Sequence, residues 1–152
     1  MATARLGQNV AVQTKQLRIL STLLLAFAVG QAGLGSGFLD EGSRGLLVAH
    51  TTNAFAVVVL SVLAAVFGLT SRRDGGPGWI FFLPVALVIA SVIQLSLGFA
   101  GIRGGHVFFG VLYLCAVTTY CSYTWRLLPT GSPAGRAAAG TQSSAEGGST
   151  AR

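Results

Sequence analysis

The sequence predicts an all-α membrane protein whose four transmembrane helices form a bundle. Only 9% of its 152 residues are charged and 52% are hydrophobic, whereas a soluble domain carries about 25% charged residues. Because a helix of about 20 apolar residues crosses a bilayer, a stretch of that length without charge predicts one crossing. Four such stretches contain no Asp, Glu, Lys or Arg: residues 19–39, 45–71, 75–102 and 104–125.

The composition also excludes several classes of protein. The stretches are too long and too continuously apolar for barrel strands, which run to about 10 alternating residues. They leave no room for an extramembrane catalytic domain, which excludes a soluble enzyme. The net charge of +6 is interpreted as membrane topology, so the expected partner is the lipid bilayer and not a nucleic acid. Cys115 and Cys121 lie on one predicted helix, and their spacing predicts neither a disulfide nor a zinc or redox motif.

The first two predicted helices form a hairpin. Residues 1–16 are polar and are expected to be a short N-terminal tail, and the first helix follows over residues 17–38. A polar loop that contains Asp40 and Glu41 ends this helix. The second helix is expected over residues 45–70, where the next apolar stretch lies.

The last two predicted helices form a second hairpin. The third helix is expected over residues 79–101, after a loop rich in Gly and Arg, with Pro84 in its first turns. A very short turn around Arg103 leads into the fourth helix, over residues 104–128. Residues 129–152 are rich in Gly, Ser, Ala and Thr and have almost no large apolar residue, so this tail is expected to be disordered.

The basic residues predict the orientation of the four-helix domain, residues 17–128. Cytoplasmic loops carry the excess of Lys and Arg. Of the ten Lys and Arg residues, only Arg44 and Arg103 fall on the side opposite to the termini. We therefore expect an integral protein of a bacterial cell membrane with both termini cytoplasmic. The eight basic residues on the cytoplasmic side are Arg5, Lys15, Arg18, Arg72, Arg73, Arg126, Arg136 and Arg152.

The two hairpins are related by an internal repeat. The motif Gln-x-x-Leu-Gly-x-small begins at Gln31 and again at Gln94, 63 residues later, near the ends of the first and third helices. After each motif come an outward arginine and then a histidine, at His50 and His106, the two histidines of the chain. Hairpins joined through the cytoplasm have the same orientation, so both histidines are expected on the outer side of the bundle.

Two histidines within the membrane predict a functional site, because ionisable groups are expensive there. A bis-histidine haem needs one imidazole on each face of the porphyrin, and a four-helix bundle holds such a cofactor between facing helices. Small residues, among them Ala54 and Gly110, would let the flat ring lie between the backbones. We therefore expect His50 and His106 to bind the iron of haem b near the outer face.

Four further residues are candidates for contact with this haem. Arg44 and Arg103 are the outward cations and suit the anionic propionates, although both also fit as ordinary loop charges. Gln31 and Gln94 are costly in lipid. Their expected roles are to link helices by hydrogen bonds, to donate to a histidine nitrogen or to touch the ligand.

Other uses of the two histidines stay open. Zinc usually takes three or four ligands, and here Asp40 and Glu41 in the first loop are the only helpers. A proton relay uses membrane carboxylates, and the apolar stretches contain none. Both histidines can also sit at the membrane interface, with the small residues serving helix–helix contact alone.

The motif and the histidine that opens the next helix resemble the haem A synthase family over residues 17–126. Members of that family are typically eight-helix proteins made of two four-helix bundles, and in each bundle the second and fourth helices supply a histidine pair. The resemblance implies that this chain is one such half, with His50 and His106 as the pair. Leu46 stands where the family has a Glu linked to its oxidation chemistry, and Thr51 replaces an Arg. The family's outward cysteine pair is absent.

Three functions follow from these observations. The first is a small cytochrome-like membrane protein that binds haem b for electron transfer or haem handling, with a partner in the respiratory chain or in haem biosynthesis. The second is a half-size oxidoreductase similar to haem A synthase, in which a homodimer would rebuild the eight-helix assembly. The third is a structural or accessory subunit without a cofactor. Whether the protein is an enzyme is left open by the sequence.

Overall fold

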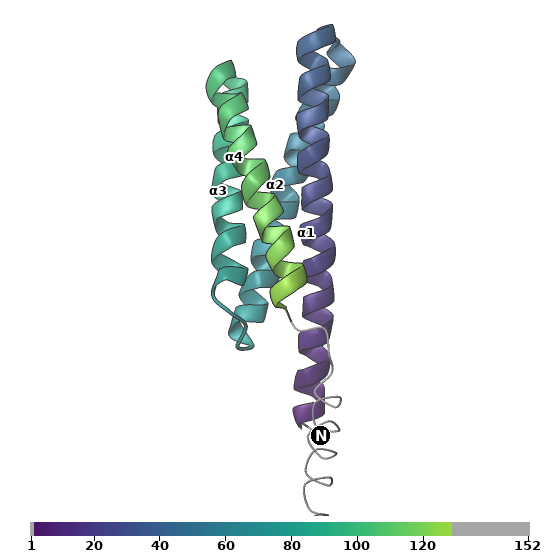
Figure 1. Ribbon diagram of the computed structural model, residues 1–152, viewed down its shortest axis with the longest axis vertical. Helices are drawn as coiled ribbons and strands as arrows, with labels where there is room; N and C mark the ends of the chain where they lie inside the picture. The colour runs from purple at the N-terminus through teal and green to yellow at the C-terminus, as the bar shows by residue number, and fades with distance from the viewer. Residues whose placement is uncertain (1, 129–152) are drawn as a thin grey trace, which may run out of the picture.

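The computed structural model describes residues 2–128, with side chains from Val12 onward, and over this range it contains four helices and no strand. All four helices are long and apolar enough to cross a membrane, which confirms the predicted all-α four-helix class. The helices are α1 (Ala2–Glu41), α2 (Arg44–Arg73), α3 (Trp79–Phe99) and α4 (Arg103–Leu127) (Figure 1).

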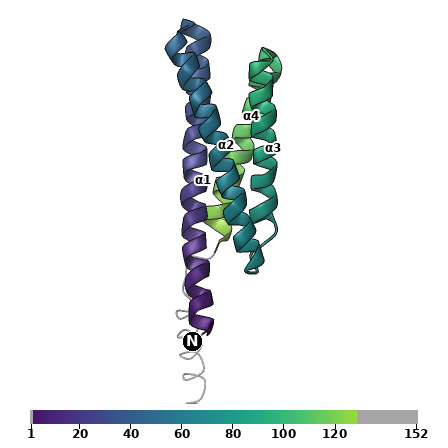
Figure 2. The same ribbon diagram turned by 180° about the vertical axis from the view of Figure 1, so that it is seen from behind.

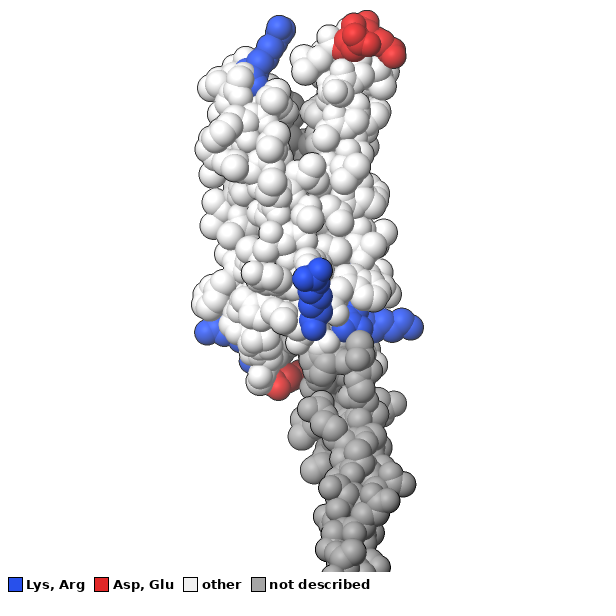
Figure 3. Space-filling view, viewed as in Figure 1, with Lys and Arg blue, Asp and Glu red and all other residues white. Residues whose placement is uncertain are grey.

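The helices pair as two antiparallel hairpins, α1–α2 and α3–α4, that run in the same direction (Figure 1, and from behind Figure 2). Helix α1 contacts α2 and α4, and α3 contacts the same two helices, so the four form a ring. Both hairpin turns lie at one end of the bundle, here called the hairpin end; the opposite end, with the N-terminus, is the tail end. The hairpins diverge toward the hairpin end, where Figure 3 shows a cleft between them.

Charged side chains gather at the two ends of the bundle. On the face that Figure 3 shows, Lys and Arg side chains lie along the tail end with an acidic side chain beside them. At the hairpin end, acidic side chains lie at the end of one hairpin and a basic side chain lies at the end of the other. The long surface between these ends is uncharged, as the hydrocarbon core of a bilayer requires. The basic residues at the tail end carry the prediction that this end is cytoplasmic.

Three glycines with positive φ end the helices. Gly42 (φ 64°) follows α1, Gly75 (φ 89°) follows α2 and Gly101 (φ 71°) separates α3 from α4. Glycine adopts this conformation without the strain that a Cβ imposes. The observed bounds of α2, α3 and α4 differ by a few residues from those predicted, because hydropathy marks the membrane whereas the backbone turns at the glycines.

Helix α1 begins earlier than predicted. It is helical from Ala2, so residues 2–16, expected as a tail before the helix, continue it. This segment contains no proline and is rich in Ala and Gln, which favour helix, so its polarity does not end the helix. The other predicted tail, residues 129–152, lies outside the described residues.

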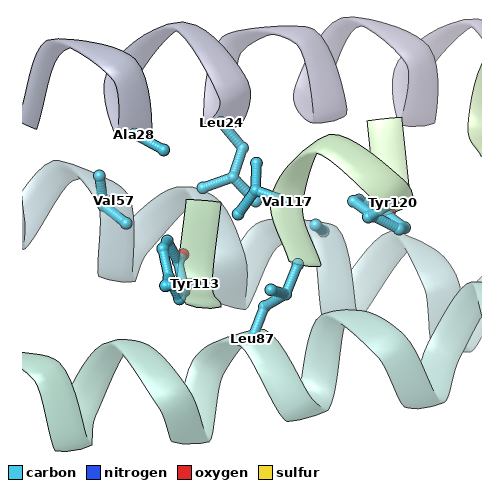
Figure 4. Close-up of a cluster of buried hydrophobic side chains, with 8 residues drawn as sticks. Leu24, Ala28, Val57, Leu87, Tyr113, Val117 and Tyr120 are labelled. Carbon is cyan, nitrogen blue, oxygen red and sulfur yellow. The ribbon is translucent and has the colours of Figure 1, made fainter. Parts of the chain in front are cut away.

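The core lies midway along the bundle, and all four helices contribute to it (Figure 4). Lipid tails give helices no hydrophobic reason to associate, so packing and polar contacts between helices matter. The hydroxyls of Ser61 and Tyr113 lie 2.9 Å apart, and those of Ser21 and Thr124 lie 2.7 Å apart, which ties α4 to α2 and to α1. The apolar core residues are Leu24, Ala28, Val57, Ala64, Leu87, Tyr113, Val117 and Tyr120.

Helices α2 and α3 approach closely near the tail end. Pro84 lies inside α3 and has no N–H, so the carbonyl of Ile80 loses its helical partner. Gly68 of α2 lies against this carbonyl, and a Cβ at Gly68 would overlap the oxygen of Ile80. Glycine is therefore required at this crossing.

Candidate functional site

The two histidines face each other at the hairpin end. His50 lies in the second turn of α2 and His106 in the first turn of α4. Their ring centres are 5.9 Å apart and the ring planes are inclined by 70°, so that the edge of one ring faces the other. Because α2 and α4 lie diagonally in the ring of helices, the pair joins the two hairpins across the bundle.

The two histidines lie at different distances from the starts of their helices, and the different reach of the two hairpins offsets this difference. His50 lies six residues after Arg44 and His106 three residues after Arg103. These offsets differ by about 4.5 Å along a helix axis. The α1–α2 hairpin extends farther than the α3–α4 hairpin at this end (Figure 1), so the two rings meet at one level.

Both rings make the same hydrogen bond within their own hairpin. The Nδ1 atom of His50 lies 3.2 Å from the backbone oxygen of Gln31, and Nδ1 of His106 lies 3.0 Å from that of Gln94. Because a carbonyl oxygen only accepts, each Nδ1 donates its proton and each Nε2 keeps its lone pair. Each imidazole is therefore in the tautomer that binds a metal through Nε2.

A glycine one turn after each glutamine makes room for the ring. A Cβ at Gly35 would lie 2.9 Å from Cε1 of His50, and a Cβ at Gly98 would lie 3.2 Å from Cε1 of His106. These are the glycines of the repeated Gln-x-x-Leu-Gly motif. The motif thus supplies a carbonyl that orients the imidazole and a surface on which the ring packs.

The side chains of the two glutamines bond differently. The Gln31 amide nitrogen lies 3.0 Å from Nε2 of His50, and the Gln31 Oε1 accepts a 2.6 Å hydrogen bond from Asn53. The Gln94 amide donates instead to the backbone oxygen of His106, at 2.6 Å, and its Oε1 is buried with no partner among the described residues. Only Gln31 therefore occupies a ring nitrogen.

Asn53 is a site residue that the sequence analysis misses. Its amide also donates to the backbone oxygen of Phe27, at 2.9 Å, so it is anchored to α1 at two points. It lies three residues after His50, and Phe109 takes the corresponding place after His106. A signal was available, because an amide side chain in an apolar helix usually bonds to a neighbouring helix.

The two outward arginines lie at the hairpin end but do not touch the histidines. Arg44 begins α2 and Arg103 begins α4, and both side chains are exposed. Within residues 2–128 neither side chain forms a hydrogen bond. The structure therefore brings together His50, His106, Gln31 and Gln94 and leaves both arginines in solvent above them.

The part of the chain that the structure describes offers no larger cluster of potential metal ligands. No group of three or more His, Cys, Asp or Glu side chains gathers there to hold a metal ion. Cys115 is exposed and Cys121 is buried, and both are free thiols.

Comparisons with protein families, with curated proteins and with solved structures find no match. The function must therefore be argued from the site itself.

Proposed function

We propose that this protein is a small membrane haem protein that holds haem b between His50 and His106, for electron transfer or haem handling. The main support is the 5.9 Å between the two ring centres. Two imidazoles that bind one metal ion from opposite sides, each at about 2 Å, have ring centres roughly 6 Å apart. Haem brings four nitrogen ligands of its own, so two histidines are enough.

Further features fit a flat macrocycle. The Nδ1 hydrogen bonds place the lone pair of each ring on Nε2, and at His50 the iron would take the place of the Gln31 amide. The two histidines stand on different hairpins that diverge around a cleft (Figure 3). Arg44 and Arg103 are the cations at this end for the propionates. When bound, haem supplies a one-electron iron couple; the chain's residues hold it and set which ligands reach it.

A half-size oxidoreductase similar to haem A synthase is the second candidate, and the resemblance of the repeat supports it. The residue at position 46 argues against this enzyme, because Leu46 has no carboxylate where the family has a Glu. The Leu46 side chain packs toward α1, where a Cβ at Gly37 would lie 3.4 Å from it. A homodimer or a partner in the respiratory chain or in haem biosynthesis would have to supply the missing group.

A structural subunit without a cofactor is the third candidate, and one contact favours it. The Gln31 amide donates to Nε2 of His50, so the protein itself satisfies this ring nitrogen. No described side chain donates to Nε2 of His106, so this ring nitrogen is open to a ligand.

The test is a haem titration of the detergent-purified full-length protein, with absorption spectra before and after reduction by dithionite. We expect about one haem per chain and a sharp reduced α-band, because two imidazoles give low-spin iron. His50→Ala and His106→Ala should each abolish this band and still insert into the membrane. Thr51→Ala is the matched control, because the Thr51 hydroxyl donates only to the backbone oxygen of Leu47.

Unchanged spectra in both histidine variants would contradict the ligand assignment. A wild-type protein that takes up no haem would contradict the proposed function as a whole and favour the structural subunit.

A further inference from the structure

The two histidines of the site differ in what surrounds their Nε2 atoms. Nε2 of His50 is 3.0 Å from the Gln31 amide nitrogen, which donates to it. Nε2 of His106 has no hydrogen-bond partner among residues 2–128, because the Gln94 amide is turned to the backbone of α4. Both rings make the same Nδ1 hydrogen bond to a glutamine backbone oxygen. The glutamine side chains differ, because only the Gln31 amide donates to an Nε2 atom.

We propose that His106 is the permanent ligand of this site and His50 an exchangeable one, so that the site admits an external diatomic ligand on the His50 side. This inference rests on the proposed haem function and adds to it an assignment of the two sides.

Two bonds to Asn53 hold the competing amide in place. Asn53 donates to the Gln31 Oε1 at 2.6 Å and to the backbone oxygen of Phe27 at 2.9 Å. With its oxygen fixed in this way, the Gln31 amide presents its N–H to His50. His50 must give up this hydrogen bond to bind a metal, whereas no described side chain has to be displaced from Nε2 of His106.

The same amide is placed to stabilise a ligand that replaces His50. Donors beside an open coordination position decide whether small ligands such as diatomic gases are held there. The Gln31 N–H already points at the place where Nε2 of His50 lies. The Gln31 side chain therefore weakens the binding of His50 to the iron and stabilises the external ligand that replaces it.

The experiment is a carbon monoxide titration of the haem-loaded, dithionite-reduced full-length protein, followed by absorption. We expect carbon monoxide to displace His50 in the wild type. Gln31→Leu should weaken the apparent affinity for carbon monoxide about fivefold, the effect of losing one ordinary hydrogen bond. Gln94→Leu is the comparison from the other repeat and should change the affinity less, since the Gln94 side chain bonds to the backbone oxygen of His106 and to neither of its ring nitrogens.

The histidine variants also test the assignment of His106 as the permanent ligand and His50 as the exchangeable one. His50→Ala should retain haem and bind carbon monoxide without competition, whereas His106→Ala should lose haem during purification. Equal haem retention in the two variants, or equal effects of the two glutamine substitutions, would overturn the inference and leave the haem function standing. No haem uptake by the wild type would overturn both.

A second measurement needs neither haem nor a variant. In haem-free protein labelled with ¹⁵N-histidine, the two histidines should both be Nδ1-protonated. The Nε2 resonances of His50 and His106 should differ, because Nε2 of His50 accepts from the Gln31 amide whereas Nε2 of His106 accepts from no described side chain. Two equivalent Nε2 resonances would contradict the asymmetry.

Discussion

At the scale of single residues, Gly35 and Gly98 set how closely each imidazole lies against its hairpin. A Cβ added at Gly35 would lie 2.9 Å from Cε1 of His50, and one added at Gly98 would lie 3.2 Å from Cε1 of His106. Both distances are shorter than an ordinary van der Waals contact, so a side chain at either position would push the ring away. The glycines therefore act on the orientation of the two imidazoles.

Gly35→Leu and Gly98→Leu should each weaken haem binding by about 1–3 kcal/mol, the usual cost of forcing extra atoms into a packed position. Haem titration followed by absorption measures the change. Gly33→Leu is the control, because a Cβ at Gly33 meets nothing within 4 Å. If all three variants bound haem like the wild type, the glycines would not position the rings.

The residue scale is also where sequence analysis reaches its limit. The repeat identifies His50, His106, Gln31 and Gln94, because identical residues recur at matching places in two hairpins. It does not predict that the two glutamine amides turn in opposite directions. That difference depends on Asn53, which has no counterpart in the second hairpin.

At the scale of helices, the crossing of α2 and α3 depends on a proline and a glycine from different elements. Pro84 frees the carbonyl of Ile80, and Gly68 lets the α2 backbone lie against it. Sequence analysis places Pro84 in the first turns of a helix but does not connect it with Gly68, because hydropathy carries no information on which helices touch.

Gly68→Ala should therefore lower the stability of the bundle by about 1–3 kcal/mol, since the two helices must move apart to admit the Cβ. Thermal unfolding in detergent measures the loss as a lower midpoint. Gly30→Ala is the matched control within the membrane, because a Cβ at Gly30 has no neighbour within 4 Å and alanine favours helix. Equal midpoints for the two variants would show that the crossing tolerates a side chain.

At the scale of the whole molecule, the apolar stretches predict the four helices and their order correctly, and the structure adds how the hairpins are set. The extra length of the α1–α2 hairpin brings unequally spaced histidines to one level (Figure 1). The divergence of the hairpins could not be predicted, because hydropathy does not reveal contacts between helices. Near the tail end, for example, Arg18 of α1 donates to the backbone oxygens of Thr124, Trp125 and Leu128.

The orientation of the whole bundle is a prediction that the basic residues carry. Arg72→Glu with Arg73→Glu removes positive charge from the α2–α3 loop and should produce a mixture of orientations. Reporter fusions at the C-terminus measure this, with a cytoplasmic C-terminus expected for the wild type. An outward C-terminus in the wild type would reverse the side on which the histidine pair lies.

The most direct test of the central claim is the absorption spectrum of the protein as isolated from cells, without added haem, together with haem quantified per chain. The account predicts coloured protein with a sharp reduced α-band, lost in the double variant His50→Ala/His106→Ala. Colourless protein that stays colourless after haem is supplied would contradict it, and the paired histidines would then be a helix contact only.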